Sequence, residues 1–297
     1  MLYVKHPSKQ CHRDKIKELW NIAFGDEDDY IEFFLDNRAS AENTLILTDE
    51  INGEEKLASV LFLLDCETRI EEKLYKTAYL YAACTHPDYR NKGCMGSLLN
   101  AAQKQCEAKG YDFISLVPAT DSLFDYYSRF NYVDAFKERV FNLKRADAES
   151  LALKSCEICE LDEVKMQNIR AQMLKEHDAL LWDRVSLKYA LDESRVGENE
   201  SIAVMQNGEC TGYAFFYKED DILTVRECAF YKDGFNLLLK ALLDFTDFKR
   251  INIKTPEFLN FDAKSKVRFN AMLLPLNKEA QIKIKSINNA CLGHTLG

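Results

Sequence analysis

The first part of the chain alternates between helical spacing and strand-like runs. Within residues 13–37, apolar side chains recur every three or four positions and Gly25 interrupts them, which predicts two short helices. Residues 44–70 contain two apolar runs separated by an Asn-Gly pair at Asn52, a pattern typical of a β-hairpin. A further strand-like run, "LYKTAYLYAACT", ends just before His86-Pro87, because proline cannot continue a strand ladder.

The pattern continues with a second set of alternating elements. Residues 96–109 have apolar positions at helical spacing, and Gly110 stands where a helix stops. "YDFISLVPA" predicts a short buried strand, "SLFDYYSRFNYVDAF" a helix, turn and strand, and "ERVFNL" a strand that closes the sheet. This order of elements predicts an α/β (α+β) domain of ordinary size.

The second half of the chain repeats this outline. Helical spacing in "MQNIRAQMLKEHDALLWDRVSLKYALDES" precedes two strand runs joined by an Asn-Gly turn at Asn207, a third strand, the helix "GFNLLLKALLDF" and the strand "RINIKT". We therefore predict two tandem domains, residues 1–147 and residues 148–297, each with a mixed sheet flanked by helices. One difference separates them: before its helix the first copy has "HPDYRNKGCMG", whereas the second has only "YKDG".

Length, composition and charge agree with two folded domains and exclude some partners. The chain has 297 residues, of which 47% are hydrophobic, and a net charge of −9. Such a charge disfavours nucleic acid and anionic membranes as partners. There is no apolar stretch of about 20 residues and no signal-peptide core, so we expect a cytoplasmic protein. The oligomeric state cannot be predicted from these features.

Ten cysteines lie along the chain without the dense spacing of a disulfide scaffold. Cys156 and Cys159 form one CxxC pair, but no second pair follows at ligand spacing, and acidic neighbours would raise the pKa of the thiols. We interpret the pair as structural and expect no metal site.

The segment between the third strand and the following helix has the features of an anion site. A glycine-bearing turn that leads directly into a helix directs free backbone N–H groups and the positive end of the helix dipole at one place. Gly93 permits close backbone approach, and Arg90 and Lys92 add positive charge. The segment is neither a Walker loop nor GxGxxG. Spacing alone leaves two interpretations open, a phosphate cradle and a solvated charged turn.

The segment "CTHPDYRNKGCMGSLL" resembles motif A of the GNAT acetyltransferase superfamily. Arg90, Gly93 and the following leucines match that motif, whereas Met95 stands where the family has a small residue, with Gly96 one place later. "FDYYSRFNYV" is similar to a later family passage, with Tyr127 at the tyrosine position. The resemblance covers residues 2–143, and the tandem outline resembles the enhanced-intracellular-survival acetyltransferases, without their C-terminal domain, and mycothiol synthase.

This resemblance implies acetyl-CoA as co-substrate and an amine, in a small molecule or a peptide, as acceptor. The pantetheine arm would pair with the strand edge and the pyrophosphate would lie on the loop amides. The implied cofactor-binding residues are Ala83, Cys84, Thr85, Arg90, Asn91, Lys92, Gly93, Cys94, Met95, Gly96 and Ser97. The amine would attack the thioester directly while Tyr127, or its neighbour Tyr126, protonates the leaving thiolate.

The general base and the acceptor remain open in the sequence. The strand before the loop has no acid, and the candidates are Asp65, Glu67, His86 and the acids of "GDEDDYIEFFLD". Cys84 raises the alternative of an acyl-cysteine, but no histidine partner is evident and direct transfer is favoured. The acids at 26–29 favour a cationic acceptor.

The resemblance thus predicts an N-acetyltransferase whose first domain is catalytic and whose second is degenerate. Two alternatives stay open: a tandem-GNAT acyl or aminoacyl transferase with another donor, and a non-catalytic acyl-CoA-binding or interaction module. Acyl-CoA binding together with thiol release separates the enzyme from the module.

Overall fold

The computed structural model describes residues 1–8, 10–152, 155–197, 199–231, 234–261, 263–287 and 290–293. The chain forms two compact units, each assembled from separate segments of the sequence. Unit 1 comprises Met1–Thr68, Lys73–Ala135 and Ala271–Ser286, and unit 2 comprises Arg69–Glu72, Phe136–Asn270 and Ile287–Gly297.

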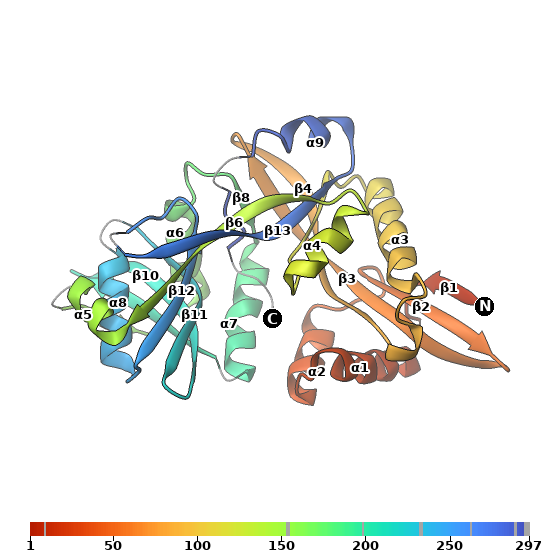
Figure 1. Ribbon diagram of the computed structural model, residues 1–297, viewed down its shortest axis with the longest axis horizontal. Helices are drawn as coiled ribbons and strands as arrows, with labels where there is room; N and C mark the ends of the chain where they lie inside the picture. The colour runs from red at the N-terminus through yellow and green to blue at the C-terminus, as the bar shows by residue number, and fades with distance from the viewer. Residues whose placement is uncertain are drawn as a thin grey trace. The chain divides into compact units, whose positions relative to one another are not determined.

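The elements of unit 1 are β1 (Leu2–Lys5), α1 (Gln10–Phe24), α2 (Asp28–Asn37), β2 (Thr44–Ile51), β3 (Glu54–Ile70), β4 (Lys73–Thr85), the 3₁₀ turn η1 (Pro87–Tyr89), α3 (Cys94–Ala108), β5 (Phe113–Leu116), α4 (Asp121–Ser128) and α9 (Lys278–Lys283). From α1 to α4, unit 1 follows the predicted order of two helices, three strands, a helix, a strand and a helix, whereas β1, η1 and α9 were not predicted (Figure 1).

The elements of unit 2 repeat the central part of this order. They are α5 (Arg145–Leu151), β7 (Glu157–Cys159), α6 (Glu163–Met173), β8 (Ala179–Leu181), α7 (Arg184–Val196), β9 (Glu200–Gln206), β10 (Glu209–Glu219), β11 (Ile222–Phe230), α8 (Gly234–Phe245) and β12 (Arg250–Pro256). Two long strands, β6 (Val133–Lys144) and β13 (Ser265–Pro275), contribute residues to both units.

The two predicted Asn-Gly hairpins are confirmed. Asn52 and Gly53 join β2 to β3 with φ of 53° and 83°, and Asn207 and Gly208 join β9 to β10 with φ of 52° and 80°. Positive φ at both central residues is what a two-residue type I′ turn requires, and asparagine and glycine adopt it at low cost. The repeat seen in the sequence is thus a repeat of hairpins in the structure.

The sheet of unit 1 has the strand order β1-β2-β3-β4-β5-β13, with helices on both faces (Figure 1). Alternate residues of β3 and β4, such as Leu61 and Leu80, pack with α3 in one apolar core. The intervening residues Phe62 and Tyr81 lie on the face of α1 and α2, where they contact Trp20. Strand alternation therefore separates an aliphatic face under α3 from an aromatic face under α1 and α2.

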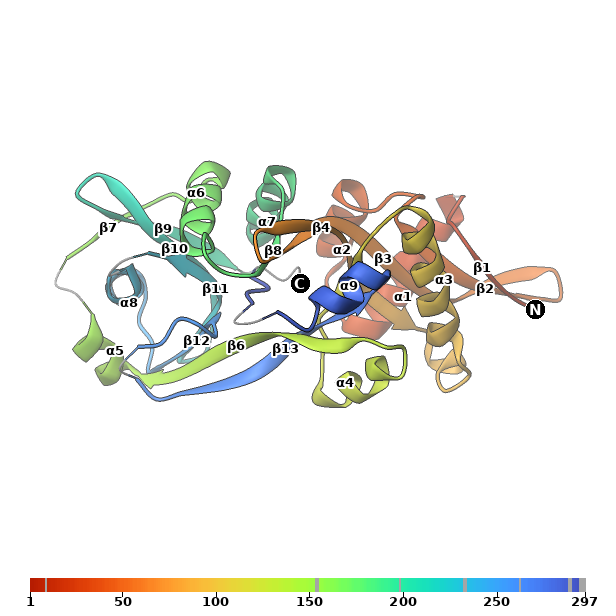
Figure 2. The ribbon, with the colours of Figure 1, turned by 90° about the horizontal axis from the view of Figure 1, so that it is seen from above.

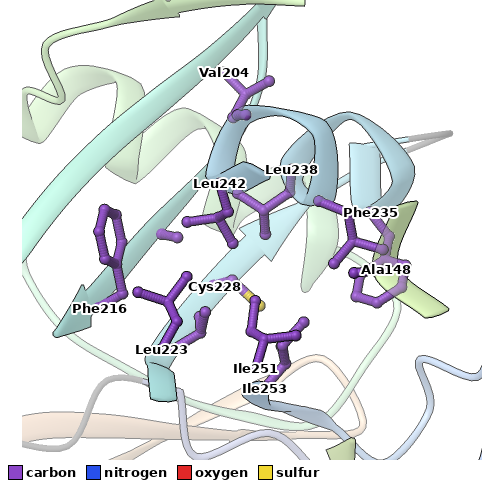
Figure 3. Packing of buried hydrophobic residues seen from close by; sticks show 14 of the residues in the cluster. Ala148, Val204, Phe216, Leu223, Cys228, Phe235, Leu238, Leu242, Ile251 and Ile253 are labelled. Atoms are coloured by element: carbon purple, nitrogen blue, oxygen red, sulfur yellow. The ribbon is translucent and has the colours of Figure 1, made fainter. Parts of the chain in front are cut away.

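In unit 2 the strands follow the order β6-β12-β11-β10-β9-β7, and α6 and α8 lie on opposite sides of them (Figure 2). Figure 3 shows Leu238 and Leu242 of α8 packed over Leu223, Cys228 and Ile251 of β11 and β12. Such an apolar helix face, buried against a sheet, supplies most of the stability that holds a unit of this kind together.

The last strand of the first repeat, β6, pairs with a strand of unit 2, and the last strand of the second repeat, β13, pairs with a strand of unit 1. Strand β6 pairs antiparallel with β12, so that Phe141 lies opposite Ile253, and β13 pairs antiparallel with β5, so that Ser115 lies opposite Leu273. The expectation that "ERVFNL" closes the first sheet is therefore wrong, because β13 covers the edge of β5. No single cut of the chain, including one at residue 147, yields these two units.

Other features of the chain can be stated briefly. In the part of the chain that the structure describes, no helix is long and apolar enough to cross a bilayer, and no group of three or more His, Cys, Asp or Glu side chains is arranged to hold a metal. Cys156 and Cys159 are half-buried free thiols. Lys232 and Asp233 of the second copy's short connection lie outside the described residues.

Candidate active site

The edge of β4 that faces β5 loses its partner half-way along the strand. The parallel register pairs Thr77 with Phe113 and Tyr79 with Ser115, and β5 ends one residue later, whereas β4 continues to Thr85. The predicted pantetheine-binding segment, residues 83–85, lies in this continuation. This segment is therefore not paired with β5, which leaves room for an extended ligand along that edge.

A strained residue stands immediately before that segment. Ala82 has φ of 46°, in the left-handed region that residues with a Cβ rarely adopt. On the other edge, the N–H of His86 donates to the carbonyl of Ala58 at 2.9 Å, and the hydroxyls of Ser59 and Thr85 lie 2.8 Å apart. Ala82 was not predicted, because an alanine in a strand-like run carries no sequence signal for a left-handed conformation.

The loop after β4 is held by contacts on several sides. Nδ1 of His86 accepts from the N–H of Asp88 at 3.2 Å and caps η1, and Nε of Arg90 donates to the carbonyl of Thr85 at 3.2 Å. The hydroxyl of Tyr89 donates to Asp49 at 3.2 Å. His86 therefore has a structural contact in this position, which agrees with a capping role more than with that of a base.

The start of α3 has the geometry of an anion cradle. Asn91 and Gly93 have φ of 61° and 76°, and residues 91–93 are exposed. No side chain caps this helix, and the N–H of Ser97, which donates to the carbonyl of Gly93 at 3.0 Å, begins its hydrogen-bond ladder. The amides of the first turn before Ser97 thus have no acceptor within the helix, and a phosphate group fits such a site.

The departure from the family motif at Met95 is accommodated by the packing of the loop. Met95 is partly buried against the α3 core, so its side chain points away from the exposed turn. A Cβ on Gly96 would lie 3.0 Å from the ring of Phe130, which makes Gly96 the position that needs a small residue. Cys94 is buried, and burial raises the pKa of its thiol. Of these residues, only the backbone faces the cradle.

Tyr127 is the more buried of the two predicted proton donors. It is 7% exposed, and burial raises the pKa of its hydroxyl to about 12. Its ring packs edge-on against Tyr126 at 5.4 Å and Tyr132 at 5.7 Å. Tyr126 is half-buried, and burial raises the pKa of its hydroxyl as well. Both hydroxyls are protonated at neutral pH, as a proton donor requires.

Cys84 does not have the environment of a nucleophile. It is buried in β4, and burial raises the pKa of its thiol to about 12. The reactive form of cysteine is the thiolate, which is disfavoured here at neutral pH. This supports direct transfer over an acyl-cysteine intermediate.

The acids suggested as bases are exposed or engaged elsewhere. Asp65 accepts a hydrogen bond from the hydroxyl of Tyr111, and Glu67 is exposed. In the acidic run, Asp26 accepts from the indole N–H of Trp20 at 2.7 Å. None of these contacts directs a carboxylate toward the unpaired edge of β4, so the structure leaves the base unassigned among them.

Comparisons with known proteins agree with this geometry. Residues 6–134 match the acetyltransferase (GNAT) domain family. No curated protein matches the sequence. Among solved structures, a GCN5-related N-acetyltransferase from Kribbella flavida shares 16% identity at a TM-score of 0.73, covering 95% of this chain and 73% of its own.

Two further solved structures agree with the resemblance seen in the sequence, one through its name and the other through its tandem organisation. Eis1 from Mycobacterium abscessus shares 13% identity at a TM-score of 0.67, covering 96% of this chain and 76% of its own. A tandem GNAT protein from the clavulanic acid biosynthesis pathway shares 12% identity at a TM-score of 0.58, covering 93% of this chain and 99% of its own.

The fold of the whole chain is therefore that of tandem GNAT proteins, and the predicted fold class is confirmed. The match to residues 6–134 also confirms the predicted superfamily and the predicted class of enzyme. Residues 6–134 match the acetyltransferase domain of the GNAT superfamily, and the whole chain has the fold of tandem GNAT proteins.

Proposed function

We propose that unit 1 transfers an acetyl group from acetyl-CoA to a primary amine by direct attack on the thioester. The observation that carries this proposal is the combination of an uncapped, exposed helix start at Gly93 with the unpaired edge of β4 at residues 83–85. A pyrophosphate and an amide-bearing pantetheine arm are the ligand groups that these two features suit. The acids at 26–29 favour a cationic amine as acceptor.

The residues of the site have separate tasks in this proposal. Backbone groups of residues 83–85 orient the pantetheine arm, and the amides of residues 91–96, with the charges of Arg90 and Lys92, hold the pyrophosphate. Tyr127, a neutral hydroxyl at neutral pH, donates a proton to the leaving sulfur. The tetrahedral nitrogen then loses its second proton to restore Tyr127.

Titration calorimetry with acetyl-CoA, followed by a thiol-release assay, tests the proposal. We expect one binding site per chain, and release of CoA when spermidine, lysine or glucosamine is added. Tyr127→Phe should lower kcat by about 100-fold, because a positioned general acid contributes about that much, and should leave acetyl-CoA affinity unchanged. Tyr126→Phe is the matched control, and the larger loss identifies the donor.

Other outcomes would lead to other conclusions. Absence of acetyl-CoA binding rejects the cradle and the enzyme together. Binding without thiol release for any amine identifies an acyl-CoA-binding module. Release with a different acyl-CoA, but not with acetyl-CoA, retains the acyltransferase and rejects acetyl as the group transferred.

A further inference from the structure

A cationic acceptor must lose a proton before it can attack, and β4 provides no carboxylate for that task. Strand β4 has the sequence "KLYKTAYLYAACT", which contains no acid. An ammonium has no lone pair, so one N–H bond must break before the C–N bond forms. A group near the unpaired part of β4 must therefore accept this proton or pass it on.

A pair of tyrosine hydroxyls lies at this position. Tyr81 directly precedes Ala82, the residue at which β4 turns, and its side chain lies on the face of α1 and α2. The hydroxyl oxygens of Tyr81 and Tyr30 lie 3.0 Å apart, within hydrogen-bond distance. Both side chains are half-buried.

Aromatic packing fixes the position of this pair. The ring of Tyr81 lies 5.7 Å from Trp20 of α1 and 5.0 Å from Phe34 of α2, and it stacks at 6.4 Å on Tyr79 of β4. Because Trp20 and Phe34 are buried, the ring of Tyr81 has little freedom to move. A fixed hydroxyl is what a proton-transfer path needs.

Acidic residues precede Tyr30, one member of the pair, in the sequence. Tyr30 belongs to the first turn of α2, next to the exposed acids at 27–29, of which Asp28 pairs with Lys17 at 2.9 Å. Asp26, which precedes them, is bound by the indole N–H of Trp20. Titratable and charged groups near the pair include these acids, Lys17, Glu32, which also pairs with Lys17, and Tyr79, whose ring stacks on Tyr81. The negative charge of these acids favours release of a proton from Tyr30 to solvent.

We propose that Tyr81 accepts the proton of the acceptor ammonium and that Tyr30 passes a proton on to solvent. As the N–H bond breaks, an O–H bond forms at Tyr81, the proton that Tyr81 carried moves to Tyr30, and the proton of Tyr30 moves to water. The freed nitrogen lone pair then attacks the thioester, and the second proton of the nitrogen is balanced by the proton that Tyr127 gives to sulfur. One proton reaches solvent per acetyl group transferred. This inference rests on the function proposed above.

Two acceptors that differ in their need for this step test the inference, when the variant is compared with the wild type for each of them. Spermidine is cationic at neutral pH, whereas methoxyamine carries a free lone pair. With acetyl-CoA as donor, Tyr81→Phe should lower kcat/KM for spermidine by about 10- to 100-fold, the range of a modest general base. It should change kcat/KM for methoxyamine by no more than about twofold, because that step is absent. The spermidine deficit should close as pH rises and free amine accumulates.

The matched control is Tyr79→Phe. This substitution removes a hydroxyl from the same face of β4, at a residue that is still paired with β5. It should leave the spermidine-to-methoxyamine ratio unchanged. Tyr30→Phe should resemble Tyr81→Phe, and the double variant should be no worse than Tyr81→Phe, because both residues serve one path.

The inference is overturned if Tyr81→Phe leaves the spermidine rate intact, or if it lowers the rates of both acceptors equally. The second result would show a purely structural role. If the wild-type protein releases CoA with no amine at all, the proposed function itself fails, and this inference fails with it.

Discussion

The two units each lead a central strand into a helix, but the two helix starts differ in what surrounds them. In unit 1, eight residues separate β4 from α3, residues 91–93 are exposed, and a Cβ on Gly93 would meet no atom within 4 Å. In unit 2, three residues separate β11 from α8, and Gly234 and Phe235 are buried. A Cβ on Gly234 would lie 2.7 Å from the Cβ of Phe230.

Aromatic side chains occupy the space around the helix start of unit 2. Phe235 stacks on Phe261 at 3.7 Å, and both lie near Phe230 at 5.6 Å. A helix start attracts an anion only where its amides reach the ligand, because the dipole effect falls off within a turn. The same topology therefore provides a candidate phosphate site in unit 1 and a packed core in unit 2.

The largest expected effect comes from removing the centre of this aromatic packing. Phe235→Ala leaves a cavity where a fully buried ring contacted three others, and it should lower the free energy of unfolding by about 3–5 kcal/mol. Denaturant unfolding measures the loss. Acetyl-CoA stoichiometry, measured by calorimetry, should stay at one per chain, since a cavity does not supply free amides. Binding of a second acetyl-CoA per chain would show that the aromatic rings alone keep this ligand from the start of α8.

The next effect concerns Tyr127 at alkaline pH. Its pKa of about 12 in the folded protein lies above the ordinary tyrosine value of about 10, so the folded state holds this proton more tightly than the unfolded state does. The resulting stabilisation is complete below about pH 10 and is lost as pH rises toward 12, a difference of about 3 kcal/mol. The unfolding free energy of the wild type should therefore fall more steeply between pH 10 and pH 12 than that of Tyr127→Phe, which lacks the hydroxyl.

The exposed Tyr3 provides the control for this pH dependence. Tyr3→Phe should reproduce the wild-type profile, because this substitution also removes a tyrosine hydroxyl but leaves Tyr127 in place. Parallel profiles for the wild type and Tyr127→Phe would contradict the burial of that hydroxyl, and with it the assignment of Tyr127 as a donor that stays protonated.

A smaller effect is expected from adding one methyl group at the closed helix start. Gly234→Ala brings a Cβ to 2.7 Å from Phe230 and 2.9 Å from the carbonyl of Thr211, and should destabilise by about 1–3 kcal/mol, the range of overpacking. Thermal unfolding measures the change. Gly212→Ala, where the nearest atom would be 3.0 Å away, should cost less. An unchanged unfolding temperature for Gly234→Ala would show that this helix start is less tightly packed than we describe.

Local signals in the sequence predicted most elements of both units. The Asn-Gly pairs at Asn52 and Asn207 specify turns that only a few residue types adopt, and Gly25 falls between α1 and α2 as predicted. The helix start after Gly93 was also predictable, because a glycine, a strand end and a helical pattern occur within a few residues of the sequence.

Features that depend on distant contacts were not predictable in this way. The pairing of β13 with β5 joins residues more than one hundred positions apart, and neither strand's own pattern names its partner. The left-handed Ala82 and the hydroxyl pair of Tyr30 and Tyr81 likewise arise from packing. At Gly96, the need for a small residue comes from Phe130, which the motif does not contain.

The smallest expected effect is the one that most directly tests the contrast between the helix starts. Gly93 and Gly110 have φ of 76° and 70° with no atom within 4 Å of an added Cβ, and they lie at opposite ends of α3. Alanine at either position should cost about 1–2 kcal/mol of backbone strain, so the two variants should lose similar stability. Only Gly93→Ala should weaken acetyl-CoA binding, by about tenfold, because relief of its strain displaces the amides of the cradle. Calorimetry at one protein concentration compares the two. Equal affinities in the two variants would mean that the exposed start of α3 does not hold the pyrophosphate, and the difference between the units would then be one of packing alone.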